Sequence, residues 1–450
     1  MTMLSDDQQA MVRAPFARQA GRAERVGVEV EAGVVDPRTG VSRPYHGERG
    51  VGALLELIMS RWGGAPVRQG GHIVGLKRSD GVEIALESGC ALEYASAPDR
   101  SLARLVDRVN ADMSALAAIA ADLDVALLSG AVLPFDRRED VHWAPKPRVP
   151  LMLAYFDREI GPGSLGWAAM AQIISIQTTL DYLDEEDLAR KFLMANAVSP
   201  LVAALFANSP LHGGALTGAL SRRIQIWSGV DPSRVGVFRH CFGGRDVVDG
   251  VVAWLLALPP IYRNGPGGEA RAVPPGMSFG RLLAEGYGDG TRPGPADWTS
   301  MLATTWPYVR LRETLELRIG DGSFQRDWAS GPALWVGLGY DRRSCEEALE
   351  LMGGYTLEEH VRAYEEVAVR GLAARIGGDS VYDLCGDLVR IARDGLKRRV
   401  GYGLEPDRVL GFLDPLEEVL RSGATPAERL AARWAADPSP ARYVQLHRYR

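Results

Sequence analysis

Glutamates recur at even spacing in segments of this sequence that have β-strand patterning. In residues 25–34 valines alternate with Glu29 and Glu31, so both carboxylates leave one face of a half-buried strand, with Cα atoms roughly 7 Å apart. Glu87 and Glu93 are again separated by an even interval, on either side of a short turn. A single pair of this kind is usually a solvated strand face. Its repetition indicates a sheet with an acidic face.

A third strand-like segment carries a glutamate together with an arginine. Glu316 and Arg318 share one face of residues 309–319, and leucines occupy the other face. Clustered carboxylates repel one another unless cations compensate them, and oxygen ligands suit Mg²⁺ or Mn²⁺ better than zinc. The guanidinium fork of Arg318 suits a phosphoryl group in transfer. These residue types therefore indicate metal-assisted phosphate chemistry on a sheet.

Several common enzyme motifs are missing from the sequence. Its seven histidines form neither HExxH nor HxH, its four cysteines form no CxxC pair, and no GxxxxGK[ST] loop is present. These absences argue against a zinc site built from histidine or cysteine and against a P-loop nucleotide site. A nucleotide held through metal ions on the sheet is the interpretation that remains.

Composition excludes some classes of partner. Hydrophobic residues make up 46% and charged residues 24% of the chain, as in a soluble globular protein. The net charge of −6 argues against a nucleic-acid binder, which needs a basic surface. No apolar run approaches the roughly 20 residues that span a bilayer, and the N-terminus lacks the apolar core of a signal peptide. We therefore expect a cytoplasmic protein without a membrane or nucleic-acid partner.

Hydrophobic periodicity predicts the elements that must position these side chains. It predicts strands over 25–34, 73–76, 82–86, 91–96, 173–182, 222–228 and 309–319. It predicts helices over 54–62, 99–123, 184–208 and most of the chain after residue 344, with an irregular segment over 263–295. Strand pairs joined by turns, with long helices between them, favour an antiparallel sheet packed on helices. We expect a lead-in over 1–24 and a single catalytic domain over 25–450 with a helical C-terminal part.

Five longer segments carry a family resemblance. They are IALESGCALEYASAP (84–98), ALFANSPLHGG (204–214), SRRIQIW (221–227), WPYVRLRETLELRIGDG (306–322) and PALWVGLGYD (332–341). From residue 25 onward, the chain resembles the glutamate–cysteine ligases, particularly their plant and proteobacterial branch. The resemblance implies an α+β fold with a curved, largely antiparallel half-barrel sheet, like that of glutamine synthetase, packed with helices.

The resemblance also implies an activity. A glutamate–cysteine ligase is an ATP-dependent carboxylate–amine ligase that joins L-glutamate to L-cysteine by a γ-glutamyl amide bond, through an acyl phosphate. The implied cofactors are ATP and Mg²⁺ or Mn²⁺. The implied partners are a small-molecule amino acid and an amine, bound by a monomer or homodimer.

Site residues follow from the resemblance position by position. The residues that match metal ligands are Glu29, Glu31, Glu87, Glu93 and Glu316. Arg318 matches a phosphate-binding arginine, so Arg318 and Glu316 are the implied catalytic pair. The residues that match the family's substrate pocket are Arg148 and Arg223, which would hold the amino acid's carboxylate, and Met152, Tyr155 and Trp227, which would line the pocket.

The chain departs from the family pattern at five positions near the expected substrate pockets. Ile173 and Thr179 stand where the family strand has threonine and asparagine, and Met301 replaces a histidine. Leu153 replaces an arginine, and Val149 replaces a tyrosine. Loss of a hydrogen bond to a substrate can redirect specificity. A paralogue with the same ligase chemistry and a different amine or acid is therefore one alternative. A metal-dependent phosphohydrolase and a catalytically dead binding protein are two further alternatives.

Overall fold

The fold is built around one large antiparallel sheet. The computed structural model describes residues 4–17, 23–239, 246–265 and 269–450. The strands of the large sheet are β1 (Val26–Val35), β2 (Ala65–Gln69), β3 (His72–Lys77), β4 (Glu83–Leu86), β5 (Leu92–Ala95), β6 (Ala126–Leu128), β7 (Ile176–Leu180), β14 (Val309–Leu311) and β15 (Leu315–Leu317). They form a nine-stranded sheet in the order β14-β15-β7-β1-β5-β4-β3-β2, with β6 paired to β1. All these pairings are antiparallel, and the sheet is open, because β14 and β2 lie at opposite ends.

Strand β1 gives this sheet two chemically different faces. Four of its valines, Val26, Val28, Val30 and Val34, are buried in the main hydrophobic core, where β1 packs against the helices α3 (Leu102–Ala121) and α11 (Ser330–Gly339). Because successive side chains of a strand point to opposite faces, Glu29 and Glu31 must leave the other side. The alternation in the sequence therefore separates the core from the acidic face.

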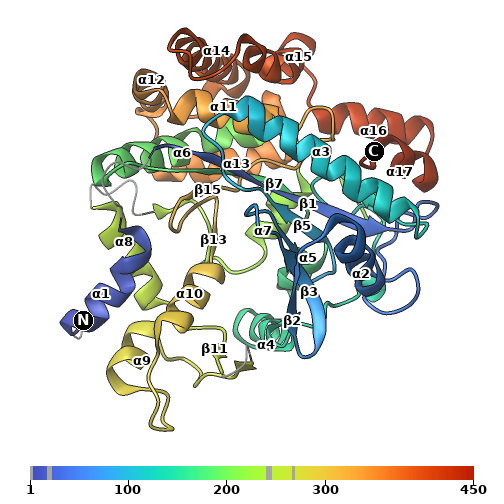
Figure 1. The fold of residues 1–450 in the computed structure, drawn as a ribbon. Helices are drawn as coiled ribbons and strands as arrows, with labels where there is room; N and C mark the ends of the chain where they lie inside the picture. Colours follow the sequence, from blue (N-terminus) through green and yellow to red (C-terminus); the bar gives the residue numbers. More distant parts are fainter. Residues whose placement is uncertain (1–3, 18–22, 240–245, 266–268) are drawn as a thin grey trace.

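A helical layer covers the core face of the sheet. Figure 1 shows α3 and α11 above the strands, with the C-terminal helices α14 (Val381–Gly401) and α15 (Asp414–Ser422) beyond α11. The remaining helices of this layer are α2 (Val51–Trp62), α6 (Glu185–Leu205), α12 (Arg342–Met352) and α13 (Leu357–Arg370). Helix α6 is the one helix in the described residues that is long and apolar enough to cross a membrane. However, 78% of its apolar window is buried inside the protein, as expected of a core helix.

Shorter elements lie on the acidic side of the sheet. They are α4 (Arg148–Tyr155), α5 (Gly166–Ala171), α7 (Arg222–Ser228), α8 (Val247–Ala257), α9 (Phe279–Glu285), α10 (Pro295–Ala303) and the two-residue strands β11 (Arg263–Asn264) and β13 (Trp306–Pro307). A second hydrophobic cluster joins α4, α5 and α7. These helices turn the acidic face of the sheet into the floor of a cavity.

Most predicted elements are confirmed, and the structure differs from the prediction in three segments, 222–228, 309–319 and 263–295. The strand over 25–34, the hairpin over 73–86 and the long helix over 184–208 are present as β1, β3–β4 and α6. The strand predicted over 222–228 is instead the helix α7, in which the Ser221 hydroxyl accepts a hydrogen bond from the backbone N–H of Ile224. That cap, together with burial of the residues on one side of a short helix, outweighs the β-propensity of the isoleucines.

The segment over 309–319 is two strands rather than one. Strands β14 and β15 form a hairpin that closes with the Arg312 N–H donating to the Thr314 carbonyl at 2.9 Å. The segment over 263–295, predicted to be irregular, contains helix α9. Within the lead-in over 1–24, helix α1 (Asp6–Arg13) begins with a capping box at Ser5 and buries Val12.

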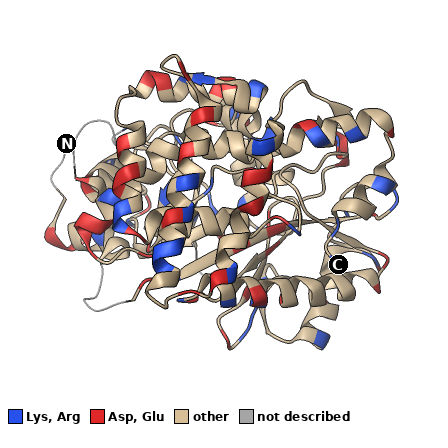
Figure 2. Ribbon diagram, turned by 90° about the horizontal axis from the view of Figure 1, so that it is seen from above, with Lys and Arg blue, Asp and Glu red and all other residues tan. Residues whose placement is uncertain are grey.

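Acidic and basic side chains are interspersed over the outer helices. Figure 2 shows both signs of charge along the helical layer, without one continuous basic face. On α12, for example, Arg342 pairs with Glu346 one turn later at 2.8 Å. Exposed pairs of this kind contribute little to stability, about 0–1 kcal/mol each.

Candidate active site

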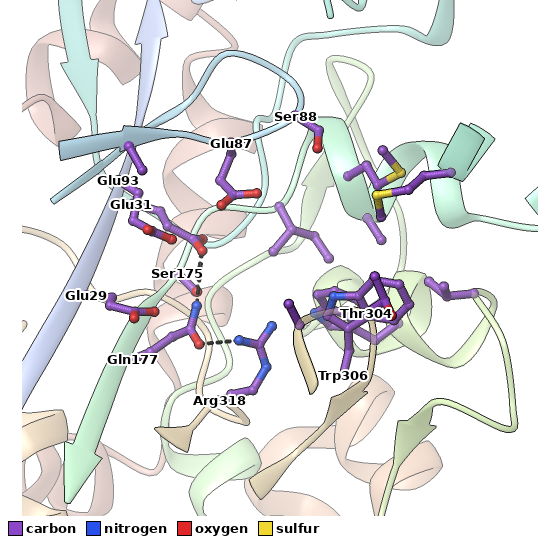
Figure 3. Close-up of a pocket in the computed structure, with 18 of the residues that line it drawn as sticks. Glu29, Glu31, Glu87, Ser88, Glu93, Ser175, Gln177, Thr304, Trp306 and Arg318 are labelled. Atoms are coloured by element: carbon purple, nitrogen blue, oxygen red, sulfur yellow. Dashed lines mark hydrogen bonds between the residues drawn. The ribbon is translucent and has the colours of Figure 1, made fainter. Parts of the chain in front are cut away.

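A cavity of about 330 Å³ lies over the acidic face of the sheet. Figure 3 shows four glutamates on one side of it and Arg318, Thr304 and Trp306 on the other. The sequence-predicted residues that line it are Glu29, Glu31, Glu87, Glu93, Arg148, Met152, Arg223, Trp227 and Arg318. The cavity therefore brings together side chains from β1, β5, α4, α7 and the segment after β15.

Three of the glutamates form a compact group. Glu31, Glu87 and Glu93 each offer a carboxylate oxygen, and these oxygens lie within 4.8 Å of one another. Register explains the grouping, because Glu31 of β1 is paired directly with Glu93 of β5. A neighbouring pair in register on one face has side chains close enough to share a ligand. All three donors are carboxylate oxygens, which is the donor set that Mg²⁺ or Mn²⁺ prefers.

The turn after β4 carries Glu87 to this group. The Glu87 N–H donates to the Ala91 carbonyl at 2.8 Å, and the Cys90 N–H donates back to the Glu87 carbonyl at 3.0 Å. Gly89 lets the turn pack against α5, since a Cβ at this position would lie 2.3 Å from the Ala171 carbonyl oxygen. Burial raises the pKa of the Cys90 thiol to about 12. This thiol is therefore protonated at neutral pH and is no candidate nucleophile.

The acidic group is electrostatically incomplete without a cation. Burial, and then the nearby Glu87, raise the pKa of Glu31 to about 8. Burial and the neighbouring glutamates also raise the pKa of Glu93 well above its ordinary value. Burial and the charge of Glu316 raise the pKa of Glu29 to about 7. Such shifts mean that these carboxylates cannot all be ionised unless positive charge enters the site, so the residues fit one or more divalent cations.

Strand β7 and the residue just before it orient Glu31, and β7 links it to the arginine side of the cavity. The Ser175 hydroxyl donates to Glu31 Oε2 at 2.9 Å, and Gln177 Nε2 donates to Glu31 Oε1 at 3.0 Å. The carbonyl oxygen of the same Gln177 side chain accepts a hydrogen bond from Arg318. Figure 3 shows this chain of contacts running from Glu31 to Arg318.

Glu316 lies in an arginine cluster rather than in the acidic group. Arg310 holds both of its carboxylate oxygens, and Arg318 also donates to it. Burial alone would raise the pKa of Glu316, but attraction to Arg310, Arg318 and Arg312 lowers it to about 2. Glu29 likewise lies outside the group of three. The metal-ligand roles of Glu29 and Glu316 remain predictions, whereas the structure brings Glu31, Glu87 and Glu93 together.

The predicted carboxylate-binding arginines differ in their surroundings. Arg148 lines the cavity from the start of α4, and its buried Nε, like that of Arg223, has no hydrogen-bond partner among the described residues. Arg223 also lines the cavity, but its two terminal nitrogens donate to the backbone carbonyls of Ile319 at 3.0 Å and Arg318 at 2.7 Å. Arg148 is therefore the better placed of the two to receive a ligand, and Arg223 fixes the backbone that carries Arg318.

A buried carboxylate organises the segment around Arg223. Asp321 accepts hydrogen bonds from the Asn208 N–H at 2.8 Å, the Ser209 hydroxyl at 2.7 Å and the Ser221 hydroxyl at 2.8 Å. These donors come from two of the sequence segments that carry the family resemblance, and Asp321 is the next-to-last residue of a third. The three segments meet because one buried carboxylate needs all of these donors.

Tyr155 is the one predicted pocket residue that does not line the cavity. Its hydroxyl donates to Asp231 at 2.8 Å, and it accepts a hydrogen bond from Arg234 Nε at 3.1 Å. Arg234 in turn donates to the Thr304 carbonyl. Because Thr304 lines the cavity, Tyr155 supports one wall from behind.

Three cationic residues of the cavity were not singled out from the sequence. They are Lys146, Arg310 and Arg312. Arg310 and Arg312 alternate along the chain ahead of Glu316. Had the sequence indicated a hairpin turn between these arginines and Glu316, the pairing of Arg310 with Glu316 could have been predicted. Lys146 lies two residues before Arg148 and donates through Nζ to the Leu86 carbonyl. Burial and nearby Arg148 lower the pKa of Lys146 to about 8.

The sequence from residue 25 to 445 matches the family model described as glutamate-cysteine ligase family 2. The chain belongs to this family and is an ATP-dependent ligase. It is 34% identical over 388 residues to the chloroplastic glutamate–cysteine ligase of Brassica juncea, covering 84% of this chain and 72% of that one. It is also 34% identical over 399 residues to the chloroplastic enzyme of Medicago truncatula, covering 87% and 75%.

A solved structure supports the fold. The chain superposes on the glutamate–cysteine ligase of Francisella tularensis, determined in complex with AMP, with a TM-score of 0.57. The match covers 96% of this chain and 89% of that one at 13% sequence identity. The predicted α+β class, with a largely antiparallel open sheet packed with helices, is confirmed.

Proposed function

We propose that this ligase joins the distal carboxylate of an amino acid, with L-glutamate as the first candidate, to an amine through an acyl phosphate. The observation that carries the proposal is the arrangement of one cavity, in which an acidic group faces an arginine cluster. Glu31, Glu87 and Glu93 offer oxygen ligands on one side, and Arg310 and Arg318 lie on the other. A triphosphate with its divalent cations needs both kinds of side chain.

Each side of the cavity would act on a different charge. Mg²⁺ or Mn²⁺ held by the glutamates would neutralise phosphate oxygens and stabilise charge that develops during transfer. Arg318, fixed by Glu316 and Gln177, would hold the phosphoryl group in transfer. Because the guanidinium is buried and already oriented, it stabilises the transition state without having to reorganise. Nucleotide binding by this chain is supported by the AMP complex of the Francisella tularensis relative.

The chemistry divides into two displacements. An oxygen of the acid's carboxylate attacks the γ-phosphorus of ATP, the bond from that phosphorus to the bridging oxygen breaks, and ADP leaves. The amine nitrogen then attacks the acyl carbon, the carbon–oxygen bond to phosphate breaks, and an amide, phosphate and a proton are released. No step needs a covalent bond to the protein, which agrees with the inert, buried thiol of Cys90.

Arg148 is the residue best placed to select the acid. A guanidinium binds a carboxylate through two parallel hydrogen bonds, and the Arg148 Nε has no other partner among the described residues. An α-carboxylate held there would leave the distal carboxylate to be phosphorylated. The resemblance supports L-glutamate as the acid and L-cysteine as the amine, with another amine as the alternative.

The proposal is tested by following ADP and product together. The protein is incubated with ATP, Mg²⁺ and each of a series of amino acids, with hydroxylamine as a small nucleophile that traps acyl phosphates as hydroxamates. L-Glutamate should give hydroxamate and ADP in equal amounts, and Arg148→Gln should raise the KM for glutamate about 100-fold. ADP release without any hydroxamate would indicate a phosphohydrolase and would overturn the proposal.

A further inference from the structure

The cavity has a polar half and an apolar half. Four glutamates and Arg318 occupy the polar half, where the phosphates would bind. The apolar half is formed by six large side chains, which are Met152, Phe156, Met170, Ile173, Trp227 and Trp306. These residues also belong to, or pack against, the second hydrophobic cluster. The apolar half is therefore continuous with a hydrophobic core and is not an isolated patch.

Ile173 lies at the boundary between the two halves. Ile173, Ser175 and Gln177 alternate along the chain, and all three line the cavity. Ser175 and Gln177 bind the carboxylate of Glu31, whereas Ile173 is 6% exposed and packs in the second cluster. One strand step of two residues, roughly 7 Å, thus separates the last polar side chain from the first apolar one.

The position of Ile173 is fixed by its backbone. Ile173 forms a bridge with Val132 in antiparallel register, and the residues before it belong to helix α5, which packs against α7. A β-branched side chain held in this way has little rotamer freedom. The hydrocarbon surface that Ile173 presents is therefore a constant feature of the cavity.

Among the five positions where this chain departs from the pattern of the family it resembles, Ile173 is the one that lines the cavity, and Val149 is buried in the second cluster. Met301 is 1% exposed in the main core, and Leu153 packs against the second cluster from outside the cavity. Thr179 lies farther along β7, paired with Glu316. Ile173 is therefore the one of these side chains that presents hydrocarbon to the cavity.

A substrate group beside Ile173 receives no hydrogen bond from this side chain. A polar group taken out of water there would lose its hydrogen bond to solvent without replacement, whereas a methyl or methylene group would gain contact. The charged α-carboxylate of the acid is better served by Arg148. The apolar half is thus suited to the body of the second substrate, the amine.

We propose that the amine acceptor has a hydrocarbon body, and that Ile173, where the two halves of the cavity meet, is the residue that sets this specificity. The inference rests on the proposed ligase function and adds the class of the acceptor. The attacking nitrogen would lie toward the arginine cluster, with its hydrocarbon chain against Ile173.

The test ranks amines that differ in one group. L-2-Aminobutyrate, L-cysteine and L-serine differ at the γ position as methyl, thiol and hydroxyl, L-norvaline adds one methylene, and n-butylamine lacks the carboxylate. With glutamate and ATP, the protein should use its best hydrocarbon amine with a kcat/KM about tenfold or more above that for cysteine or serine. If norvaline is the best substrate, the acceptor carries a carboxylate, and if n-butylamine is the best, it does not. Both results support the proposal.

Two variants isolate the polarity of the side chain. Threonine and valine have nearly the same shape, and both are smaller than isoleucine. Ile173→Thr should lower the ratio of kcat/KM for hydrocarbon over hydroxyl amines about tenfold, whereas Ile173→Val should lower the rate but keep the ranking. Direct calorimetric binding of the amines to each variant should follow the same order.

Three results would count against this inference. A highest kcat/KM for cysteine or serine in the unmodified protein overturns it without any variant. Equal shifts in ranking for Ile173→Thr and Ile173→Val show that size and not polarity is sensed, and also overturn it. Hydroxamate formation separates these failures from failure of the ligase proposal. If hydroxamate forms and cysteine is the best amine, only the proposed acceptor class is wrong. If no acid gives hydroxamate, the ligase proposal is wrong as well.

Discussion

Arg310 and Glu316 form a bidentate ion pair across the β14–β15 hairpin, with Nε to Oε2 at 3.0 Å and the second terminal nitrogen to Oε1 at 2.7 Å. The two residues are direct partners in the register of the hairpin. Glu316 also receives a hydrogen bond from Arg318, which in turn contacts Gln177. Glu316 is therefore the anion that holds two guanidinium groups on the side of the cavity opposite Glu31.

The first prediction removes that anion. Glu316→Gln should lower turnover about 100-fold, because Arg318 loses the partner that orients it. The same change should lower the free energy of unfolding by about 3 kcal/mol, because two buried guanidinium groups lose their counter-charge. Steady-state kinetics and urea unfolding measure the two effects.

Arg318→Lys is the matched variant for this prediction. It keeps the positive charge beside Glu316, so the free energy of unfolding should fall by only about 1–2 kcal/mol. Turnover should still fall by about 100-fold, because a lysine ammonium lacks the bidentate fork. Near-normal turnover in a folded Glu316→Gln or Arg318→Lys protein would falsify the role given to this cluster.

The second prediction concerns the effect of pH on stability through the buried carboxylates of Glu29 and Glu31. The pKa values of Glu29 and Glu31 are raised to about 7 and about 8, so between about pH 4.5 and 8 the folded metal-free protein binds more protons than the unfolded chain. Its stability should therefore fall as the pH rises through this window. Mg²⁺ should restore stability by an amount that grows with pH, because it binds the ionised carboxylates.

Glu31→Gln separates this effect from general pH sensitivity. Without metal, the variant should be more stable than the unmodified protein at about pH 8 and similar to it at about pH 5, because the raised pKa is removed. Thermal unfolding in EDTA and in Mg²⁺ measures both comparisons. A variant that is less stable at about pH 8 in EDTA would show that Glu31 is not strained by its neighbours.

The third prediction tests the buried carboxylate that organises the family segments. Asp321→Asn places an amide N–H₂ among three donors, so it should cost about 2–3 kcal/mol of unfolding free energy. Turnover should also fall, because Arg223 and the backbone of Arg318 lose their support. Exposed Asp289, which pairs with Arg263, provides the control. Asp289→Asn should cost less than about 1 kcal/mol and leave kcat and KM as they were.

Part of this site follows from sequence periodicity because a strand has only two faces. The alternation around Glu29 and Glu31 was sufficient to place both carboxylates away from the core. The grouping of Glu31 with Glu93 was not accessible, because it depends on the register between β1 and β5, which local pattern does not specify. Family resemblance supplied what periodicity lacked.

The errors in the predicted elements and site also arise because local sequence pattern does not specify tertiary contacts. In residues 309–319 hydrophobic and charged residues alternate without a strong turn signal, so the sequence did not predict the hairpin. The pairing of Arg310 with Glu316 was therefore not predicted either. In residues 222–228 two isoleucines suggested a strand, but the Ser221 cap and tertiary burial decide for a helix. Tyr155 was placed in the pocket, and its hydroxyl is instead held by Asp231.

The last prediction separates the metal site from the charge of the sheet. Glu87 and Glu83 lie four residues apart on the same segment, but Glu87 belongs to the group of three oxygens, whereas Glu83 is exposed and pairs with Lys77 at 2.8 Å. Both Glu→Gln changes remove one negative charge. If oxygen ligands and not general charge bind the cation, Glu87→Gln alone should weaken Mg²⁺-dependent nucleotide binding, by about tenfold or more. Calorimetric titration of ADP measures this at fixed Mg²⁺, and Mn²⁺ bound without nucleotide gives an independent reading. Equal effects of Glu87→Gln and Glu83→Gln would mean that the cation is held elsewhere in the cavity, with Glu29 and Glu316 as the next residues to change.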